Sequence, residues 1–201
     1  MRVGIIGQGY VGLTISVDAA RAGHVVLGYE VNEELVSALN AGRSHIEGVS
    51  DSTLAALIQK GAYKATVDAS GLDGCDVIVI AVPTPLDLMK NPDLSYLEAA
   101  TKLIAKNVNR SALVVNESTS YPGTLRNFIK PILDEASNQK FLFAVAPERV
   151  DPGNLEWNIK NTPRNISGLT DQATNDAVTF YSGFCDSINT LLKPEIAEAA
   201  K

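Results

Sequence analysis

The chain has 201 residues, of which 45% are hydrophobic, enough to form the core of one large domain or two small ones. Its net charge of −6 is spread without basic clusters, which argues against binding nucleic acid or anionic membranes. It shows neither a signal-peptide segment nor an apolar run approaching the roughly 20 residues of a membrane span. Two cysteines without a CxxC pair predict reduced thiols in a cytoplasmic protein.

Short apolar runs alternate with amphipathic stretches along the chain, which is typical of repeated βα units. Predicted strands cover residues 2–6, 24–30, 76–82, 112–118, 141–146 and about 187–192. Predicted helices cover residues 10–22, 32–41, 51–61, 93–108, 123–137 and about 171–183, with Pro131 as a candidate bend in the fifth. Several strands are apolar almost throughout, as strands covered on both faces are. We predict a Rossmann-like α/β fold: a doubly wound, mostly parallel sheet with helices on both faces.

The segment GQGYVG at residues 7–12 directly follows the first predicted strand and opens the first predicted helix. Gly7, Gly9 and Gly12 form a G-x-G-x-x-G pattern, which provides a tight turn, close backbone approach to a pyrophosphate, and close helix–strand packing. Glu30 ends the second predicted strand, where a carboxylate accepts hydrogen bonds from the adenosine ribose and repels a 2′-phosphate. This arrangement predicts a site for NAD rather than NADP; a glycine-rich turn that binds nothing is the alternative.

Two further segments follow predicted strands, where loops at the carboxyl ends of parallel strands line the ligand crevice. AVPTPLD at residues 81–87 is a stiff double-proline loop that could hold Thr84 against a cofactor, or could simply be a rigid strand exit. NESTSYPGT at residues 116–124 is rich in hydroxyls. Ser118 and Thr119 could donate to a nicotinamide, a ribose or a reacting oxygen, and hydroxyls of this segment could also cap the helix that follows.

A third segment of this kind, APERVDPGN at residues 146–154, places Glu148 at the same edge of the predicted sheet. A partly desolvated carboxylate there can act as a general base or position a water, although a surface or ion-paired glutamate is the alternative. Cys75 and Cys185 are predicted to be small buried hydrophobes, and Trp157 and Tyr181 are predicted to pack. His24 lies in a turn and His45 in a polar loop, and neither has a metal or triad partner in view.

Taken together and in this order, GQGYVGL, VPTPL, ESTSYPGT and APERVDPGN resemble the cofactor domain of the nucleotide-sugar 6-dehydrogenases. That family includes the UDP-glucose, UDP-N-acetylglucosamine and UDP-N-acetylmannosamine dehydrogenases, and the resemblance covers essentially the whole chain. ERVDPGN looks closer to the enzymes that act on N-acetylated UDP-hexosamines. The resemblance implies oxidation of the sugar C6 alcohol to a carboxylate by two hydride transfers to two NAD molecules. A cysteine carries the aldehyde as a thiohemiacetal and then as a thioester.

At matching positions the resemblance implies catalytic roles for Thr119 beside nicotinamide and substrate, for Glu148 in handling protons or water, and for Lys201. It implies further cofactor contacts, beyond the glycines and Glu30, at Tyr10, Val11, Val82, Pro83, Thr84, Ser118 and Thr119. It also implies a UDP-sugar substrate and a homodimer for the full-length enzyme. The spacing of the cysteines and histidines predicts no metal site.

Two positions depart from the family pattern. Leu35 stands where many members carry a basic residue five positions past the ribose acid, which predicts a weaker grip on the adenosine side. Pro152 stands four residues after Glu148, where the glucose enzymes have a second glutamate. A nicotinamide contact is therefore expected to be lost or supplied differently.

The last residues, PEIAEAAK at 194–201, resemble the start of the family's long interdomain helix, with Lys201 as its lysine. The family's later asparagine, its catalytic cysteine and its UDP-binding domain have no counterpart here. We therefore predict an NAD-binding domain over residues 1–193 that has no sustained turnover by itself. Fraying or rearrangement is expected near Lys201, because so short a helix is marginal in water. The alternatives are a stand-alone, non-catalytic NAD-binding module and a domain of the 3-hydroxyacyl or 6-phosphogluconate dehydrogenase type.

Overall fold

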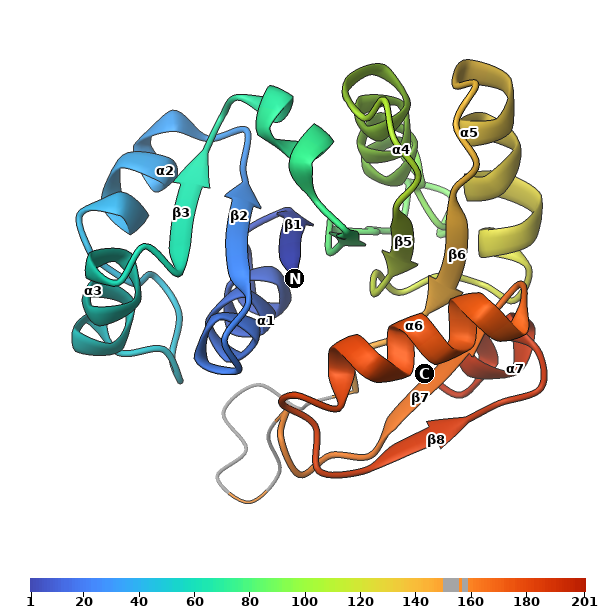
Figure 1. Cartoon of the computed structure of the whole chain (residues 1–201). Coiled ribbons are helices and arrows are strands. Elements are labelled where there is room, and N and C mark those ends of the chain that lie inside the picture. Colours follow the sequence, from blue (N-terminus) through green and yellow to red (C-terminus); the bar gives the residue numbers. More distant parts are fainter. Residues whose placement is uncertain (150–155, 157–158) are drawn as a thin grey trace.

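The computed structural model describes residues 1–149, 156 and 159–201, and strands and helices alternate along them (Figure 1). The elements of the first half are β1 (Arg2–Ile6), α1 (Tyr10–Arg21), β2 (Val25–Tyr29), α2 (Glu33–Asn40), α3 (Asp51–Gln59), β3 (Tyr63–Thr66), the 3-10 helix η1 (Ala69–Gly74), β4 (Val77–Ile80) and α4 (Ser95–Asn107). Those of the second half are β5 (Leu113–Asn116), the π-helical segment η2 (Leu125–Ile129), α5 (Lys130–Ala136), β6 (Leu142–Val145), β7 (Arg164–Gly168), α6 (Asp171–Tyr181), β8 (Ile188–Thr190) and α7 (Pro194–Ala199).

In the described residues these strands form an eight-stranded sheet in the order β3-β2-β1-β4-β5-β6-β7-β8. The strands from β3 to β6 in this order are all parallel, β7 is antiparallel to β6, and β8 is parallel to β7. The predicted mostly parallel, doubly wound α/β sheet is confirmed. The strand order reverses between β1 and β4, and in such sheets the ligand crevice lies at the carboxyl ends of the strands flanking the reversal.

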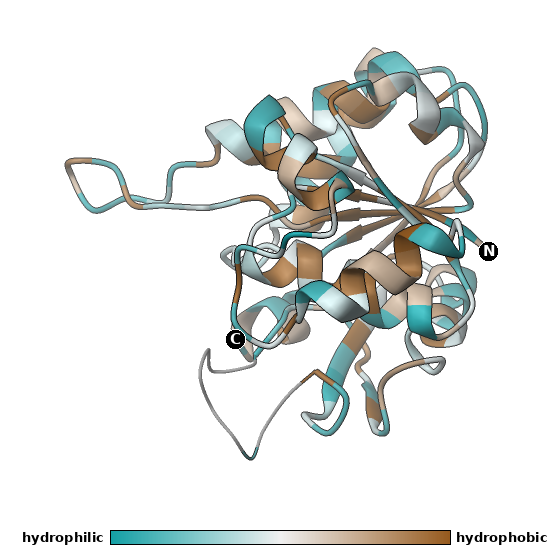
Figure 2. Cartoon of the chain, turned by 90° about the vertical axis from the view of Figure 1, so that its left-hand side faces the viewer, coloured by the Kyte–Doolittle hydropathy of each residue, from teal (hydrophilic) through white to brown (hydrophobic). Residues whose placement is uncertain are grey.

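Helices cover both faces of the sheet. Side chains of the helices and the strands form one hydrophobic cluster on each face. The first cluster packs α1, α3 and α6 on one face, through residues such as Leu13, Leu54 and Phe180. The second packs η1, α4, α5 and α7 on the other face, with Leu97 and Leu133 fully buried. Figure 2 shows the hydrophobic strands enclosed between the two helix layers. Within the described ranges, the structure shows no helix long and apolar enough to cross a membrane.

The predicted helix over residues 123–137 is divided into η2 and α5. Pro131 lies at the start of α5 and has no backbone N–H to donate to the preceding turn, where the helix widens into the π-helical segment. A bend of the helix axis at Pro131 stays a prediction. Strands β3 and β7 were not predicted: β3 is a short strand at the edge of the sheet, and β7 contains polar residues that break the apolar pattern.

The expectation of fraying or rearrangement near Lys201 is wrong for the preceding residues Pro194–Ala199, which form α7. The helix packs on the same domain, because Ala197 is 1% exposed in the second hydrophobic cluster and the Glu198 carboxylate is buried beside it. Short helices in proteins are stabilised by such packing rather than by their own propensity. A division of the chain after residue 193 stays a prediction.

Candidate functional site

A cavity of about 570 Å³ lies at the carboxyl ends of β1, β2, β4 and β5, within the usual size range of small-molecule sites. This is the position that the reversal of strand order predicts. The predicted cofactor and catalytic residues that line it are Gly7, Gly9, Tyr10, Val11, Glu30, Val82, Pro83, Thr84, Ser118, Thr119 and Lys201. Gly12 lies directly behind the glycine loop, and Glu148 is not among the lining residues of the described chain.

The glycine loop has the geometry that a pyrophosphate needs. Gly7 has φ +90°, in the left-handed region. A Cβ on Gly12 would lie 1.9 Å from the Gly7 carbonyl oxygen, so only glycine lets α1 pack this closely on the turn. A Cβ on Gly9 would meet no protein atom within 4 Å, so the backbone there faces open space. The first amides of α1 have no side-chain cap, which leaves them available to an anion.

The Glu30 carboxylate is held in one orientation by three backbone amides. Its Oε2 accepts a hydrogen bond from the Gln8 amide at 2.9 Å. Its Oε1 accepts from the amides of Val31 and Asn32 at 2.9 and 3.1 Å. A carboxylate offers about four acceptor positions, so one remains for a ribose hydroxyl. Leu35 also lines this part of the cavity and is an apolar neighbour of Glu30 there; its effect on cofactor affinity stays a prediction.

Gln8, the first variable position of the glycine pattern, is a functional residue that the sequence analysis missed. Its side chain is fully buried and donates to the carbonyls of Ile5 and Gly7, both at 3.1 Å. Its Oε1 accepts from the Ser16 hydroxyl at 3.1 Å and from the Tyr63 hydroxyl at 2.9 Å. The buried amide therefore fixes the loop to β1, α1 and β3.

The loops after β4 and β5 are tied together by Ser118. Its hydroxyl accepts from the Val82 amide at 3.0 Å and donates to the Val82 carbonyl at 2.8 Å. The single proton of this hydroxyl is thus engaged within the protein, and a contact between Ser118 and the cofactor stays a prediction. The hydroxyl positions the loop that carries Val82 and Thr84. Thr119 is exposed at the cavity, and its hydroxyl has no partner within the described residues.

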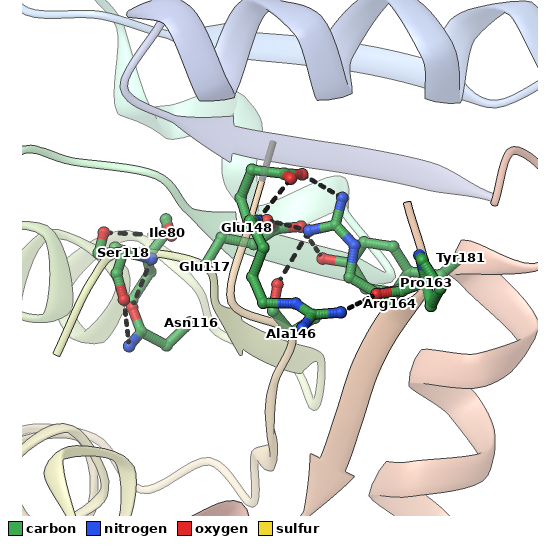
Figure 3. A network of polar contacts seen from close by, with 10 residues as sticks. Ile80, Asn116, Glu117, Ser118, Ala146, Glu148, Pro163, Arg164 and Tyr181 are labelled. Carbon is green, nitrogen blue, oxygen red and sulfur yellow. Dashed lines mark hydrogen bonds and ion pairs between the residues drawn. The ribbon is translucent and has the colours of Figure 1, made fainter. Parts of the chain in front are cut away.

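A buried network of charges lies next to the cavity (Figure 3). Nη1 of Arg164 donates to Oε2 of Glu117 at 2.7 Å and to the Ala146 carbonyl at 3.1 Å, and its Nη2 pairs with Glu148. The Tyr181 hydroxyl donates to the other oxygen of Glu117. The side chains of Glu117, Arg164 and Glu148 are 0%, 3% and 5% exposed. Arg164 therefore bridges the two acids: Glu117 lines the cavity, and Glu148 is not among its described lining residues.

Burial sets the protonation behaviour of this cluster. Loss of water raises the pKa of Glu117 to about 7, although the Arg164 guanidinium opposes the shift. Lys201 is an exposed residue, but protein atoms around its ammonium lower its pKa, while Glu117 and Glu148 act in the opposite direction. The cavity thus brings together a carboxyl and an ammonium group with shifted pKa values, which is typical of functional sites.

Cys75 and Cys185 are buried, as expected, and burial raises the pKa of each thiol to about 11. Tyr181 packs as predicted but also uses its hydroxyl on Glu117, a contact that was not predicted. Pro152 and Trp157 lie outside the described residues. Among the residues that the structure describes, no cluster of histidine, cysteine, aspartate and glutamate could hold a metal ion.

The fold and the cavity define a Rossmann-like dinucleotide-binding domain, with a glycine loop at a helix N-terminus and an acid at the end of the second strand. The chain belongs to the UDP-glucose/GDP-mannose dehydrogenase family, whose NAD binding domain matches residues 1–184. Its cofactor is NAD, in agreement with the prediction from Glu30. The family match argues against a domain of the 3-hydroxyacyl or 6-phosphogluconate dehydrogenase type.

Known relatives are similar over the whole chain. The chain is 35% identical over 206 residues to UDP-N-acetyl-D-mannosamine dehydrogenase of Pyrococcus horikoshii, covering 100% of this chain and 49% of that protein. A solved UDP-D-ManNAc dehydrogenase from that organism superimposes with a TM-score of 0.91 at 34% identity, with 100% and 49% coverage. A UDP-glucose dehydrogenase structure from Pyrobaculum islandicum has a TM-score of 0.91 at 31% identity, covering 99% and 48%. The chain thus spans about half the length of these relatives.

Proposed function

We propose that the chain is the NAD-binding part of an enzyme that oxidises the C6 alcohol of a UDP-sugar to a carboxylate. One observation carries this proposal: Thr119, Glu117 and Lys201 line the same cavity as the glycine loop and Glu30. Cofactor-binding and proton-handling groups thus share one site. We further propose a UDP-N-acetylhexosamine as the substrate. The ERVDPGN segment supports this choice, as do relatives named for UDP-N-acetyl-D-mannosamine and UDP-N-acetyl-D-glucosamine.

In this proposal the amides at the start of α1 bind the cofactor pyrophosphate, and the Glu30 carboxylate binds the adenosine ribose. NAD, when bound, would accept the hydride. Oxidation of an alcohol to a carboxylate removes two hydrides, takes up one water and releases protons. Two NAD molecules are therefore reduced for each sugar. Thr119 lies beside the nicotinamide of the cofactor and the substrate. The Lys201 ammonium stabilises negative charge that develops on the substrate oxygen.

Glu148 has the role of positioning or deprotonating the water that completes the carboxylate. Its ion pair with Arg164 supports this role, because the pair holds the carboxylate in a defined orientation and Arg164 also binds Glu117, which lines the cavity. Arg164 also neutralises part of the negative charge that Glu117 and Glu148 bring together. The side chain of Arg164 therefore serves as a support for two acids.

The proposed reaction also needs a reactive thiol. Cys75 and Cys185 do not line the cavity, are 1% and 7% exposed, and have raised pKa values, so neither is a suitable nucleophile. We propose that the thiol and most sugar contacts lie in the part of the relatives that this chain does not span. The 201 residues alone then bind NAD without sustained turnover. A homodimer is likewise a proposal for the full-length enzyme.

Isothermal titration calorimetry of the chain with NAD and with NADP tests the cofactor role. We expect saturable binding of NAD and much weaker binding of NADP; no heat at millimolar NAD would contradict the proposal. NADH absorbance with UDP-N-acetylglucosamine or UDP-N-acetylmannosamine tests the second part. Sustained NADH formation by these 201 residues would show that they contain a complete active site. A stand-alone binding module remains the competing interpretation if a polypeptide with the length of the relatives is also inactive.

A further inference from the structure

One buried carboxylate fastens α7 to the segment that follows the Thr119 loop. Glu198 is 3% exposed, its Oε2 accepts from the Gly123 amide at 2.6 Å, and its Oε1 accepts from the Leu125 amide at 2.8 Å. These two amides open the η2–α5 helix, whose N-cap residue Thr124 makes no capping hydrogen bond to the helix amides through its side chain. Amides at a helix start have no partner within the helix and favour a negative charge. Glu198 therefore completes a helix start that lies 73 to 75 residues earlier in the chain.

Two further contacts hold α7 in the same place. Nε of Arg126 donates to Oε1 of Glu195 at 2.7 Å, in an ion pair that is partly exposed. Ala197 is buried with Leu125 and Ile129 in the second hydrophobic cluster. The six residues of α7 are too few for a stable isolated helix, so these contacts determine where the helix lies.

Lys201 follows Glu198 by three residues and lines the NAD cavity together with Thr119. Thr119, in turn, precedes Gly123 by only four residues. The Glu198 carboxylate thus joins two short chain segments. One runs from Glu198 to Lys201, and the other runs from Thr119 to the Gly123 amide. Displacement of Glu198 from the two amides would change the separation of these side chains.

We propose that Glu198 is a positioning residue, which sets Lys201 at the cavity by binding the amides of Gly123 and Leu125. The inference rests on the proposed role of Lys201 in the reaction. Glu198 is not among the described residues that line the cavity, and it acts on the reaction through Lys201 and the Thr119 loop. The competing explanation is that Glu198 only stabilises the fold.

The test compares Glu198→Gln with Glu195→Gln in the 201-residue chain. The Glu198→Gln substitution retains the size of the side chain but leaves one oxygen acceptor in place of two. The matched control Glu195→Gln removes the partly exposed ion pair from the same helix and leaves Glu198 intact. Side-chain signals of Lys201 in lysine-labelled protein, assigned with Lys201→Arg, report its pKa and its mobility by NMR. Hydrogen exchange of the Gly123 and Leu125 amides reports the contact itself.

In Glu198→Gln we expect exchange of at least one of the two amides to accelerate by about tenfold or more, because a charged hydrogen bond is lost. The Lys201 pKa should rise towards its ordinary value and its side chain should become more mobile. The control should change the Lys201 signals much less, because Glu198 and Ala197 still hold α7 in place. Unchanged Lys201 signals in a folded Glu198→Gln variant would overturn the proposal, even if that variant melted at a lower temperature.

If Glu198→Gln does not fold, Glu198→Asp decides the question, because it keeps the charge but is one methylene too short to reach both amides. Failure of both variants to fold would assign Glu198 to the fold alone and would also overturn the proposal. The Lys201 measurements are made without cofactor. A chain that fails to bind NAD but shows the expected Lys201 changes would contradict the proposed function and leave the positioning by Glu198 intact.

Discussion

Glu117 and Arg164 are 47 residues apart in the chain and form an ion pair in the protein interior, with 2.7 Å between Oε2 and Nη1. The pair depends on the direction of β7. Since β7 runs antiparallel to β6, its first residue, Arg164, lies at the carboxyl edge of the sheet, close to the residues that follow β5 and β6. A parallel strand in this place would begin at the opposite edge. The inverted strand is therefore what delivers a cation to Glu117 and Glu148.

Replacing Arg164 with methionine should destabilise the fold strongly, because two buried carboxylates lose their shared cation. Breaking a buried pair of this kind costs about 3–5 kcal/mol of unfolding free energy. Urea unfolding followed by circular dichroism measures the loss. Arg110→Ala is the matched control: its ion pair with Asp76 is about half exposed, so its loss should cost less than about 1 kcal/mol. Equal losses in the two variants would contradict a buried role for Arg164.

Glu117 should make stability depend on pH. Its pKa is about 7 in the folded protein and near its ordinary value of 4.5 when unfolded, so between these values the folded state binds a proton that the unfolded state lacks. The unfolding free energy should therefore fall as pH rises from about 4.5 to about 7, by as much as about 3 kcal/mol. Glu117→Gln should remove this part of the pH dependence while lowering stability overall. Urea midpoints measured across this pH range give the unfolding free energy of the wild-type chain and of Glu117→Gln. The same pH dependence in both proteins would argue against the raised pKa of Glu117.

Gly9 and Gly12 should separate cofactor binding from folding. Gly9→Ala places a methyl group in open space at the cavity, at an ordinary negative φ, so the chain should keep its stability and lose affinity for NAD. Gly12→Ala would bring a methyl group to 1.9 Å from the Gly7 oxygen and should destabilise the fold by about 2 kcal/mol or more. Thermal unfolding and NAD titration of both variants test the pair. A Gly9→Ala variant that was destabilised but still bound NAD would contradict the role of Gly9 in cofactor binding.

Glu30→Gln should weaken NAD binding and reduce the preference for NAD over NADP. One of the two carboxylate oxygens is replaced by an NH₂ group, so either the Gln8 amide or the Val31 and Asn32 amides lose their acceptor. We expect the NAD dissociation constant to rise by about 10- to 100-fold. Repulsion of a 2′-phosphate falls at the same time. Glu34→Gln, on an exposed position of the next helix, should change neither constant, and calorimetry with both cofactors makes the comparison.

The parts of the fold that the sequence predicted are those encoded by local patterns. The apolar run at residues 2–6 coincides with β1, and the amphipathic stretch from residue 171 is α6. The glycine loop and Glu30 were identified for the same reason, since their spacing follows from one strand, one turn and one helix. Their positions at the cavity agree with these predictions.

The parts that could not be predicted depend on partners distant in the chain. The sequence RNISG of β7 contains three polar side chains that are buried because other elements satisfy them. Arg164 pairs with two acids, and the Ser167 hydroxyl donates to the Leu191 carbonyl at 2.8 Å. Glu198 is a similar case, because only the fold brings it to Gly123 and Leu125. No local pattern distinguishes these residues from exposed polar ones.

The buried amide of Gln8 limits how this loop can be exchanged between proteins. A Cβ on Gly28 would lie 2.6 Å from the Gln8 side chain, and the hydroxyls of Ser16 and Tyr63 donate to the same oxygen of Gln8. The position between the first two glycines of the motif is therefore coupled to three residues on three other elements. A transplant of the six-residue motif into another scaffold would carry over only one of these four residues. The four would have to be moved together as one unit.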